Sequence, residues 1–154
     1  MNSQPYLALD AAIWILVRDG NRTGLDLFLR HYSATRGERR KIGQFVGPGG
    51  KMVLLTADAR ALFVWRRAEY RTDGQIGIDC AVFRNEGTAA GRSSDLIREA
   101  CALAWERWPH ERLFTFVDAA KVRRKRDPGR CFLRAGFRLC GKTQTGKLIL
   151  ELKP

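Results

Sequence analysis

The most constraining feature of the sequence is a change of hydrophobic period at Ser93. From Ser93 to Trp108 the apolar residues recur at three- and four-residue spacing, which predicts one broad apolar face of a helix. We expect Ser93 or Ser94 to cap this helix, Asp95 to lie in its first turn, and Pro109 to end it. The nearly continuous apolar run 113–117 follows and is typical of a central strand. A long helix between strands therefore predicts a sheet that is at least partly parallel.

The segments around this unit alternate apolar runs with turn residues. Six more short runs predict strands: 12–17, 51–56, 62–70, 76–83, 137–140 and 147–152. The three middle runs follow one another at about ten-residue spacing, which indicates an antiparallel meander. Helical spacing between Leu25 and Tyr32 predicts a helix, and Asp127-Pro128-Gly129 is expected to open a short one that ends at Gly136. The fold class is therefore α/β or mixed α+β, in one domain over residues 1–154.

The composition excludes several classes of protein. With 154 residues, 45% hydrophobic and 29% charged, the chain has the balance of a globular domain. Its four cysteines are widely spaced and its two histidines are isolated, so we expect reduced thiols and no metal site. The longest apolar run, 11–17, is far shorter than the roughly 18 residues that cross a bilayer. Residues 1–5 lack the layout of a secretory signal, so we expect a cytoplasmic protein with no membrane partner.

The formal net charge of +12 is concentrated at one end of the chain. Residues 111–154 contain 12 basic and 4 acidic side chains. This imbalance favours a polyanionic partner, either a nucleic acid or an acidic cofactor, although a basic protein without such a partner is the alternative. Two basic stretches are the candidate DNA-binding residues: Arg36, Arg39, Arg40, Lys41, Lys121, Arg123, Arg124, Lys125 and Arg126. The second stretch has two other readings, a solvated loop and a site for the 3′-phosphate of coenzyme A.

The order of the expected elements, together with the segment Pro128–Phe137, resembles the Gcn5-related N-acetyltransferase (GNAT) fold over nearly the whole chain. The resemblance implies a central mixed sheet of about seven strands flanked by three or four helices, and acetyl-CoA or a related acyl donor. In that family the donor's pyrophosphate lies at the amino end of the long helix, where free N–H groups and the helix dipole favour an anion. The residues implied to contact the donor are Val82, Phe83, Gly91, Arg92, Ser93, Ser94, Cys131 and Phe132.

Two positions depart from the common GNAT pattern. The loop 88–93 has the small residues Gly91 and Ser93 of the family's pyrophosphate motif but begins with threonine in place of glutamine or arginine. Phe132 stands where many members have a tyrosine acid, and phenylalanine has no proton to donate. Together with the basic C-terminal segment, these departures favour a reaction other than routine acetylation of amines.

Three short segments are similar to the Mom-like phage DNA-modification proteins: His31-Tyr32-Ser33, Arg92-Ser93-Ser94-Asp95, and Asp118 after the fifth expected strand. This resemblance implies transfer of a small acyl-derived group to the N6 amine of adenine in DNA, in the host cytoplasm if a phage encodes the chain. An acetyl-CoA-dependent N-acetyltransferase of a protein or small-molecule amine is the alternative, and a non-catalytic binder is a third. The oligomeric state stays open, with a homodimer among the possibilities.

Five side chains are the candidate catalytic residues: His31, Tyr32, Ser33, Ser94 and Asp118. A histidine titrates close to working pH and can accept a proton, whereas a histidine at a helix end can equally serve the dipole. Ser94 can orient a donor group or simply cap the helix. Asp118 follows a central strand, where ligands collect, but aspartate is also common in turns. The tryptophans at 65, 105 and 108 are expected in the core because their neighbours are apolar.

Overall fold

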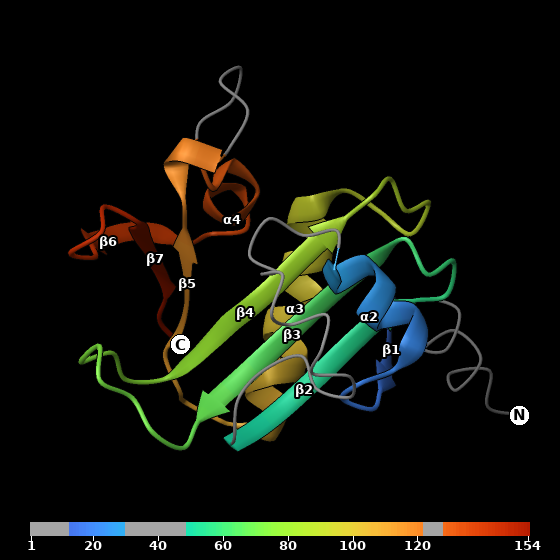
Figure 1. Cartoon of the computed structure of the whole chain (residues 1–154), viewed down its shortest axis with the longest axis horizontal. Helices are drawn as coiled ribbons and strands as arrows, with labels where there is room; N and C mark the ends of the chain where they lie inside the picture. Colours follow the sequence, from blue (N-terminus) through green and yellow to red (C-terminus); the bar gives the residue numbers. More distant parts are fainter. Residues whose placement is uncertain (1–12, 30–48, 122–127) are drawn as a thin grey trace, which may run out of the picture.

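Seven strands form a single mixed sheet in the computed structural model, which describes residues 13–29, 49–121 and 128–154 (Figure 1). The order across the sheet is β1-β2-β3-β4-β5-β7-β6. The strands are β1 (Trp14–Val17), β2 (Gly49–Thr56), β3 (Ala61–Ala68), β4 (Ile78–Asn85), β5 (Leu113–Val117), β6 (Arg138–Lys142) and β7 (Leu148–Leu152). The helices of the described residues are α2 (Arg22–Leu29), α3 (Ser93–Arg107) and α4 (Arg130–Arg134), with a 3-10 turn η2 (Ala119–Lys121).

The pairing of the strands confirms the expected mixed α/β class. Strands β1 to β4 form an antiparallel meander, β4 and β5 are parallel, and β5, β7 and β6 are again antiparallel. Helix α3 is the crossover between the two parallel strands, as a parallel pair requires. The fourth strand begins at Ile78 and not at Ile76, because the φ of +123° at Gly77 interrupts the extended backbone. An added Cβ at Gly77 would lie 2.2 Å from the carbonyl oxygen of Arg112, so this close approach requires glycine.

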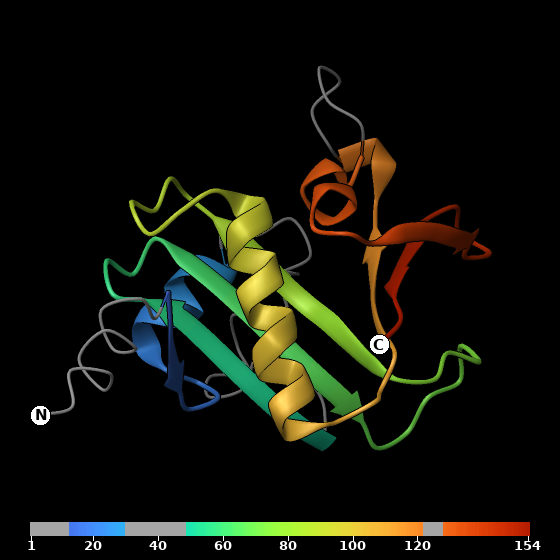
Figure 2. The ribbon, with the colours of Figure 1, turned by 180° about the vertical axis from the view of Figure 1, so that it is seen from behind.

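Helices cover both faces of the sheet. Seen from behind, α3 crosses the face formed by β2, β3 and β4 (Figure 2). The indole nitrogens of Trp14 and Trp65 donate to the carbonyl oxygens of Leu96 and Ala100 in α3, each over 2.8 Å. Helix α2 packs on the opposite face through Leu27 and Phe28. Burying both faces of the central strands explains why their sequences read as continuous apolar runs.

The tryptophan prediction is confirmed for two of the three side chains. Trp65 is fully buried and Trp108 is 7% exposed, both in the cluster between the sheet and α3. Trp105 is only partly buried and donates to the carbonyl oxygen of Glu111 over 2.8 Å. No helix in the described ranges is long and apolar enough to cross a membrane.

Both predicted helix starts need correction. Arg92, and neither Ser93 nor Ser94, is the N-cap of α3, and no side chain caps it. The hydroxyl of Ser93 is engaged by Asn85 instead. Helix α4 begins at Arg130 after Gly129, whose φ of +74° is left-handed, so Pro128 precedes the helix and is not its first residue. Asp127, the predicted cap, lies outside the described residues.

Candidate functional site

Strands β4 and β5 separate after only three paired residues. The parallel register runs from Ile78 opposite Leu113 to Cys80 opposite Thr115, and β4 then continues to Asn85 while β5 ends at Val117. Both ribbon views show the strands diverging, with α4 between their ends (Figures 1 and 2). We call this feature the β4–β5 fork. The later part of β4, residues 81–85, pairs with β3 on one side and with no described strand on the other.

The base of the fork is held by two polar contacts. Thr115, which is 4% exposed, donates from Oγ1 to the carbonyl oxygen of Cys80 over 3.3 Å. The Cys80 thiol in turn lies 3.4 Å from the carbonyl oxygen of Val82. Burial raises the pKa of the Cys80 thiol well above its usual value, so this group stays protonated and acts as a donor. Val82 was predicted to contact the acyl donor. Its backbone lies on the fork, while its side chain packs against α2.

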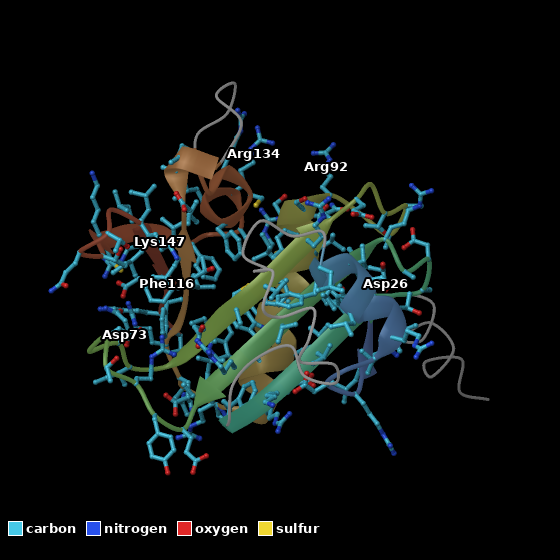
Figure 3. All side chains as sticks on the ribbon, viewed as in Figure 1. Asp26, Asp73, Arg92, Phe116, Arg134 and Lys147 are labelled. Carbon is cyan, nitrogen blue, oxygen red and sulfur yellow. The ribbon has the colours of Figure 1, made fainter. Side chains whose placement is uncertain are left out.

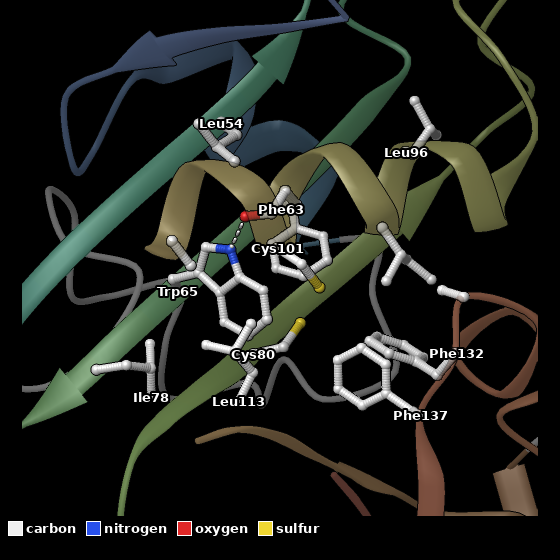
Figure 4. Packing of buried hydrophobic residues seen from close by; sticks show 14 of the residues in the cluster. Leu54, Phe63, Trp65, Ile78, Cys80, Leu96, Cys101, Leu113, Phe132 and Phe137 are labelled. Atoms are coloured by element: carbon white, nitrogen blue, oxygen red, sulfur yellow. Dashed lines mark hydrogen bonds between the residues drawn. The ribbon is translucent and has the colours of Figure 1, made fainter. Parts of the chain in front are cut away.

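Aromatic rings occupy the space where the strands diverge. The ring of Phe132 in α4 packs against Phe83 of β4 and Phe137, with centroid distances of 5.9 and 5.2 Å. It also lies 6.5 Å from Phe63 in β3, and Figure 4 shows Phe132 and Phe137 facing the strands below α3. Phe132 is 6% exposed and Cys131 beside it is half-buried. Their predicted contact with a donor stays a prediction, and Phe132 has a structural role in joining α4 to the sheet.

Two side chains brace the loop between β4 and α3. The Asn85 carboxamide oxygen accepts from the N–H groups of Gly87 and Thr88 over 2.9 and 3.1 Å. Asp58, in the β2–β3 turn, accepts from the Thr88 hydroxyl over 2.9 Å and from the Ala89 N–H over 3.0 Å. These bonds, with others from Thr56 and the Arg60 N–H, hold the pKa of Asp58 far below its usual range. The loop that enters α3 is therefore fixed in place before any ligand binds.

The amino end of α3 presents backbone donors without acceptors. The first intrahelical bond runs from the Leu96 N–H to the carbonyl oxygen of Arg92. The N–H groups of residues 93–95 consequently have no acceptor among the residues that the structure describes. Ser93 and Ser94 are half-buried and Arg92 is exposed. Gly91 has room for a Cβ, with the nearest atom 3.8 Å away, so the space around it does not require glycine. Free N–H groups together with the helix dipole favour an anion at this end.

Asp118 lies directly after β5 and takes part in a turn. Its Oδ1 accepts from the N–H of Ala120 over 3.1 Å, which shapes η2. Asp118 therefore has the role of a turn aspartate that the sequence analysis gave as the alternative. Its second carboxylate oxygen accepts no hydrogen bond from the described residues, and Asp118 is half-buried at the end of the strand that forms one side of the fork.

Most of the other predicted site residues belong to segments 30–48 and 122–127. His31, Tyr32 and Ser33, and the basic residues Arg36, Arg39, Arg40 and Lys41, lie outside the described residues. The same holds for Arg123, Arg124, Lys125 and Arg126, while Lys121 is the last residue of η2. The structure brings Phe83, Cys131 and Phe132 together around the fork, and Gly91 to Ser94 at the start of α3, whereas the side chain of Val82 packs on the opposite face against α2.

Sequence reasoning missed three residues of this region, Arg130, Arg134 and Asp58. Arg130 and Arg134 are exposed on α4, and their four-residue spacing was the signal that could have revealed them as one basic face. Asp58 joins the site through contacts thirty residues away, for which the sequence carries no signal. In the described part of the chain, no group of His, Cys, Asp or Glu side chains could hold a metal ion.

A separate groove of about 350 Å³ lies between the carboxyl half of α3 and strands β1 and β2. Its lining is Trp14, Leu16, Met52, Leu54, Leu103, Glu106 and Arg107. None of these residues belongs to the predicted site, and the three that come from α3 lie in its carboxyl half, far from its amino end.

The comparisons with known proteins return no relative: no protein-family model matches the chain, and no curated protein matches it significantly. The assignment of a function therefore depends on the geometry above.

Proposed function

We propose that this chain is a GNAT-like transferase of the Mom-like type, which moves a small acyl-derived group from an acetyl-CoA-type donor to the N6 amine of adenine in DNA. The observation that carries the proposal is the β4–β5 fork with the amino end of α3 beside it. Sheets of mixed α/β proteins bind ligands outside the carboxyl ends of their parallel strands, which is where this fork opens.

The donor would be held by backbone groups of this chain. Beyond Cys80, one edge of β4 lacks a partner strand among the described residues, and an extended arm with amide groups can pair with such an edge as an added strand does. The unaccepted N–H groups of residues 93–95 suit the donor's pyrophosphate. Asn85 and Asp58 support this arrangement, because they fix the loop that precedes those N–H groups.

The reaction is a nucleophilic acyl-type substitution. The amine nitrogen attacks the electrophilic carbon of the donor, a carbon–nitrogen bond forms, and the carbon–sulfur bond breaks. The amine loses a proton to a base, and the sulfur leaves as a thiolate that takes up a proton. His31 and Asp118 are the candidate bases, with Tyr32, Ser33 and Ser94 as groups that can orient or protonate. Phe132 cannot serve as the acid, since it has no hydroxyl.

The charge of the chain supports DNA as the acceptor. A net charge of +12 attracts polyanions, and the basic excess lies in the C-terminal segment that includes α4. An adenine amine is inaccessible inside a stacked duplex, so the enzyme must act on a base that is unpaired or rotated out of the helix. Phosphate contacts on both sides of the target would then be needed to hold the strand.

Nucleoside mass analysis of DNA from cells that produce the protein tests this proposal. We expect a modified adenine with the native chain and a loss of at least tenfold with Asp118→Asn. Asparagine keeps the oxygen that accepts from Ala120, so the turn survives while the charge and the basicity are lost. Ser94→Ala is the companion variant for the donor side.

A second measurement separates donor from acceptor. Acetyl-CoA should raise the melting temperature of the purified protein, because a ligand that binds only the folded state stabilises it. If acetyl-CoA stabilises the protein but the DNA stays unmodified, the proposal that DNA is the acceptor is overturned. That result would favour acetylation of a protein or small-molecule amine. If acetyl-CoA does not stabilise the protein and the DNA carries no modified adenine, the transferase assignment is overturned.

A further inference from the structure

Three exposed arginines lie at the end of the molecule where the fork opens. Arg92 is the N-cap of α3, and Arg130 and Arg134 are the first and last residues of α4. We call these three side chains the α3–α4 arginine edge. Arg130 and Arg134 are four residues apart, so they project from the same side of their helix.

The two helices are joined at this edge. Arg98 of α3 donates from Nη2 to the carbonyl oxygen of Arg134 over 2.6 Å, which fixes the carboxyl end of α4 beside the first half of α3. Figure 3 shows the side chains of Arg92 and Arg134 extending outward from the same end of the molecule. Their guanidinium groups therefore point into solvent from two elements that border the fork.

Carboxylates of the described chain leave this edge uncompensated. None of the three guanidinium groups forms an ion pair within the described ranges, whereas Arg66 and Arg71 share Asp79, and Arg112 pairs with Glu151. Of the described acidic groups closest to these arginines in sequence, Asp95 pairs with Arg98 over 2.9 Å, and one carboxylate oxygen of Asp118 accepts from the Ala120 N–H. Unpaired like charges on one edge repel one another, so their presence favours a ligand that brings negative charge.

We propose that the α3–α4 arginine edge binds the phosphodiester backbone of DNA. The edge is an outward row of charges and not an enclosed site, which suits a polymer of phosphates better than a single small anion. A guanidinium group can form paired hydrogen bonds with phosphate oxygens, so each arginine can hold one phosphate. This inference rests on the proposed function for its partner, and it adds where the strand runs: across α4 and the start of α3, next to the opening of the fork.

The position has a consequence for the target base. A strand that is bound along this edge passes the end of the fork, so a base rotated out of the stack is presented on the side where a donor would lie. None of the basic residues that the sequence predicted as a DNA site belongs to this edge, so the edge is an additional contact.

The test is the salt dependence of binding to a fluorescent DNA duplex, measured by anisotropy. The slope of log K against log salt is negative, and each lost phosphate contact makes it shallower by about 0.9. For Arg92→Ala/Arg130→Ala/Arg134→Ala we expect the slope to become shallower by about 2.7 and the affinity at about 0.1 M salt to fall roughly a hundredfold. The matched control is Arg18→Ala/Arg22→Ala/Arg67→Ala, which removes the same charge from the opposite end of the sheet and should keep the native slope to within about 1.

Two further arms interpret the result. The triple lysine variant of the edge keeps the charge and should retain most of the slope, which excludes a folding defect as the cause. The acetyl-CoA stabilisation of the double variant Arg130→Ala/Arg134→Ala, which keeps Arg92 among the implied donor contacts, should equal that of the native protein. If that stabilisation is lost while the DNA slope is kept, the arginines serve the donor and the inference is overturned.

Three other outcomes would also overturn the inference. Equal losses in the edge variant and its control would show a general charge effect and overturn the inference. Native DNA binding with an unchanged slope in the edge variant would overturn it too, but would leave the proposed function standing. Failure of the native protein to bind or modify DNA would overturn the proposed function, and the inference with it.

Discussion

The carboxamide nitrogen of Asn85 donates to the Oγ of Ser93 over 2.9 Å, so the last residue of β4 is tied directly to the first residue of α3. The oxygen of the same carboxamide accepts two N–H groups of the intervening loop. One side chain thus closes the loop, and the Ser93 hydroxyl is used for this purpose and not to cap its helix. The backbone donors of the first turn are left for a ligand.

Ser93→Pro tests whether the backbone N–H groups at the start of α3 bind the phosphates of acetyl-CoA. Proline is tolerated at the first helical position, and Arg92 before it already has the extended φ and ψ of −74° and 155° that proline requires. The change therefore removes one N–H group and leaves the helix intact. We expect acetyl-CoA binding, measured by calorimetry, to weaken by about tenfold, since a hydrogen bond to a charged group contributes about 1.5–3 kcal/mol.

Ser93→Ala is the control for this change. It loses the same bond to Asn85 and keeps the backbone N–H, so its affinity should stay close to that of the native chain. Equal affinities of the proline and alanine variants would remove the α3 amino end from the donor site.

Asp58→Asn should loosen the loop before α3. The asparagine nitrogen cannot accept from Thr88 and Ala89, so we expect a lower melting temperature at neutral pH and weaker acetyl-CoA binding. The folded state lowers the pKa of Asp58, so its contribution to stability is present above the pKa of the unfolded chain, near 3.8, and is lost as pH falls below it. The difference between native and variant melting temperatures should therefore shrink on acidification.

Asp26→Asn provides the comparison, because Asp26 is an exposed carboxylate on α2 without these bonds. Its effect on melting temperature should be small at every pH. A pH-independent gap between Asp58→Asn and the native protein would contradict the assigned role of the carboxylate.

Local patterns predicted the elements of this fold well. The apolar stripe of residues 93–108 and the run at 113–117 are read from spacing within each segment, and both elements occur within one residue of their expected bounds. The meander was equally visible, because each strand is buried on a face covered by a helix. These features follow from the burial of neighbouring side chains, which the sequence displays directly.

The geometry of the site was beyond such patterns. The fork depends on how far Cys80 and Thr115 stay paired, and the loop depends on Asp58, which is thirty residues from Thr88. Neither relation has a period or a motif. The prediction of the N-cap of α3 was wrong for the same reason. Both serines suit an N-cap locally, but a longer-range hydrogen bond from Asn85 engages Ser93.

Gly129→Ala should destabilise the protein through α4. Gly129 has φ +74°, and an added Cβ would lie 2.5 Å from Leu150 Cδ1 and 3.2 Å from Val117 Cγ2. We expect a loss of about 2–4 kcal/mol in the free energy of unfolding, from the left-handed backbone and the overpacking together. Gly74→Ala isolates the backbone contribution, because Gly74 has φ +73° with no atom within 4 Å. Urea unfolding of both variants should show the larger loss at Gly129, and equal losses would exclude the clash.

Glu151→Gln should lower stability in a pH-dependent manner. Glu151 is 5% exposed and lies 2.7 Å from Arg112 Nε and 2.8 Å from Arg138 Nη2. Hydrogen bonds from Arg112 and then Arg138 lower the pKa of this carboxyl to about 2. Its stabilisation is therefore complete above the unfolded pKa near 4.5 and disappears as pH falls toward 2.

At neutral pH we expect the Glu151→Gln change to cost on the order of 2 kcal/mol, which is less than the full pKa shift implies because Arg138 is largely in water. Urea unfolding at pH 7 and at pH 3 should show a smaller cost at pH 3, where part of the stabilisation is already lost, with Glu69→Gln as an exposed control. Because Glu151 of β7 accepts from both Arg112 and Arg138 of β6, the variant should also unfold these two strands first in hydrogen exchange. A cost that is the same at pH 7 and pH 3 would mean that packing around residue 151, and not its charge, stabilises this edge of the sheet.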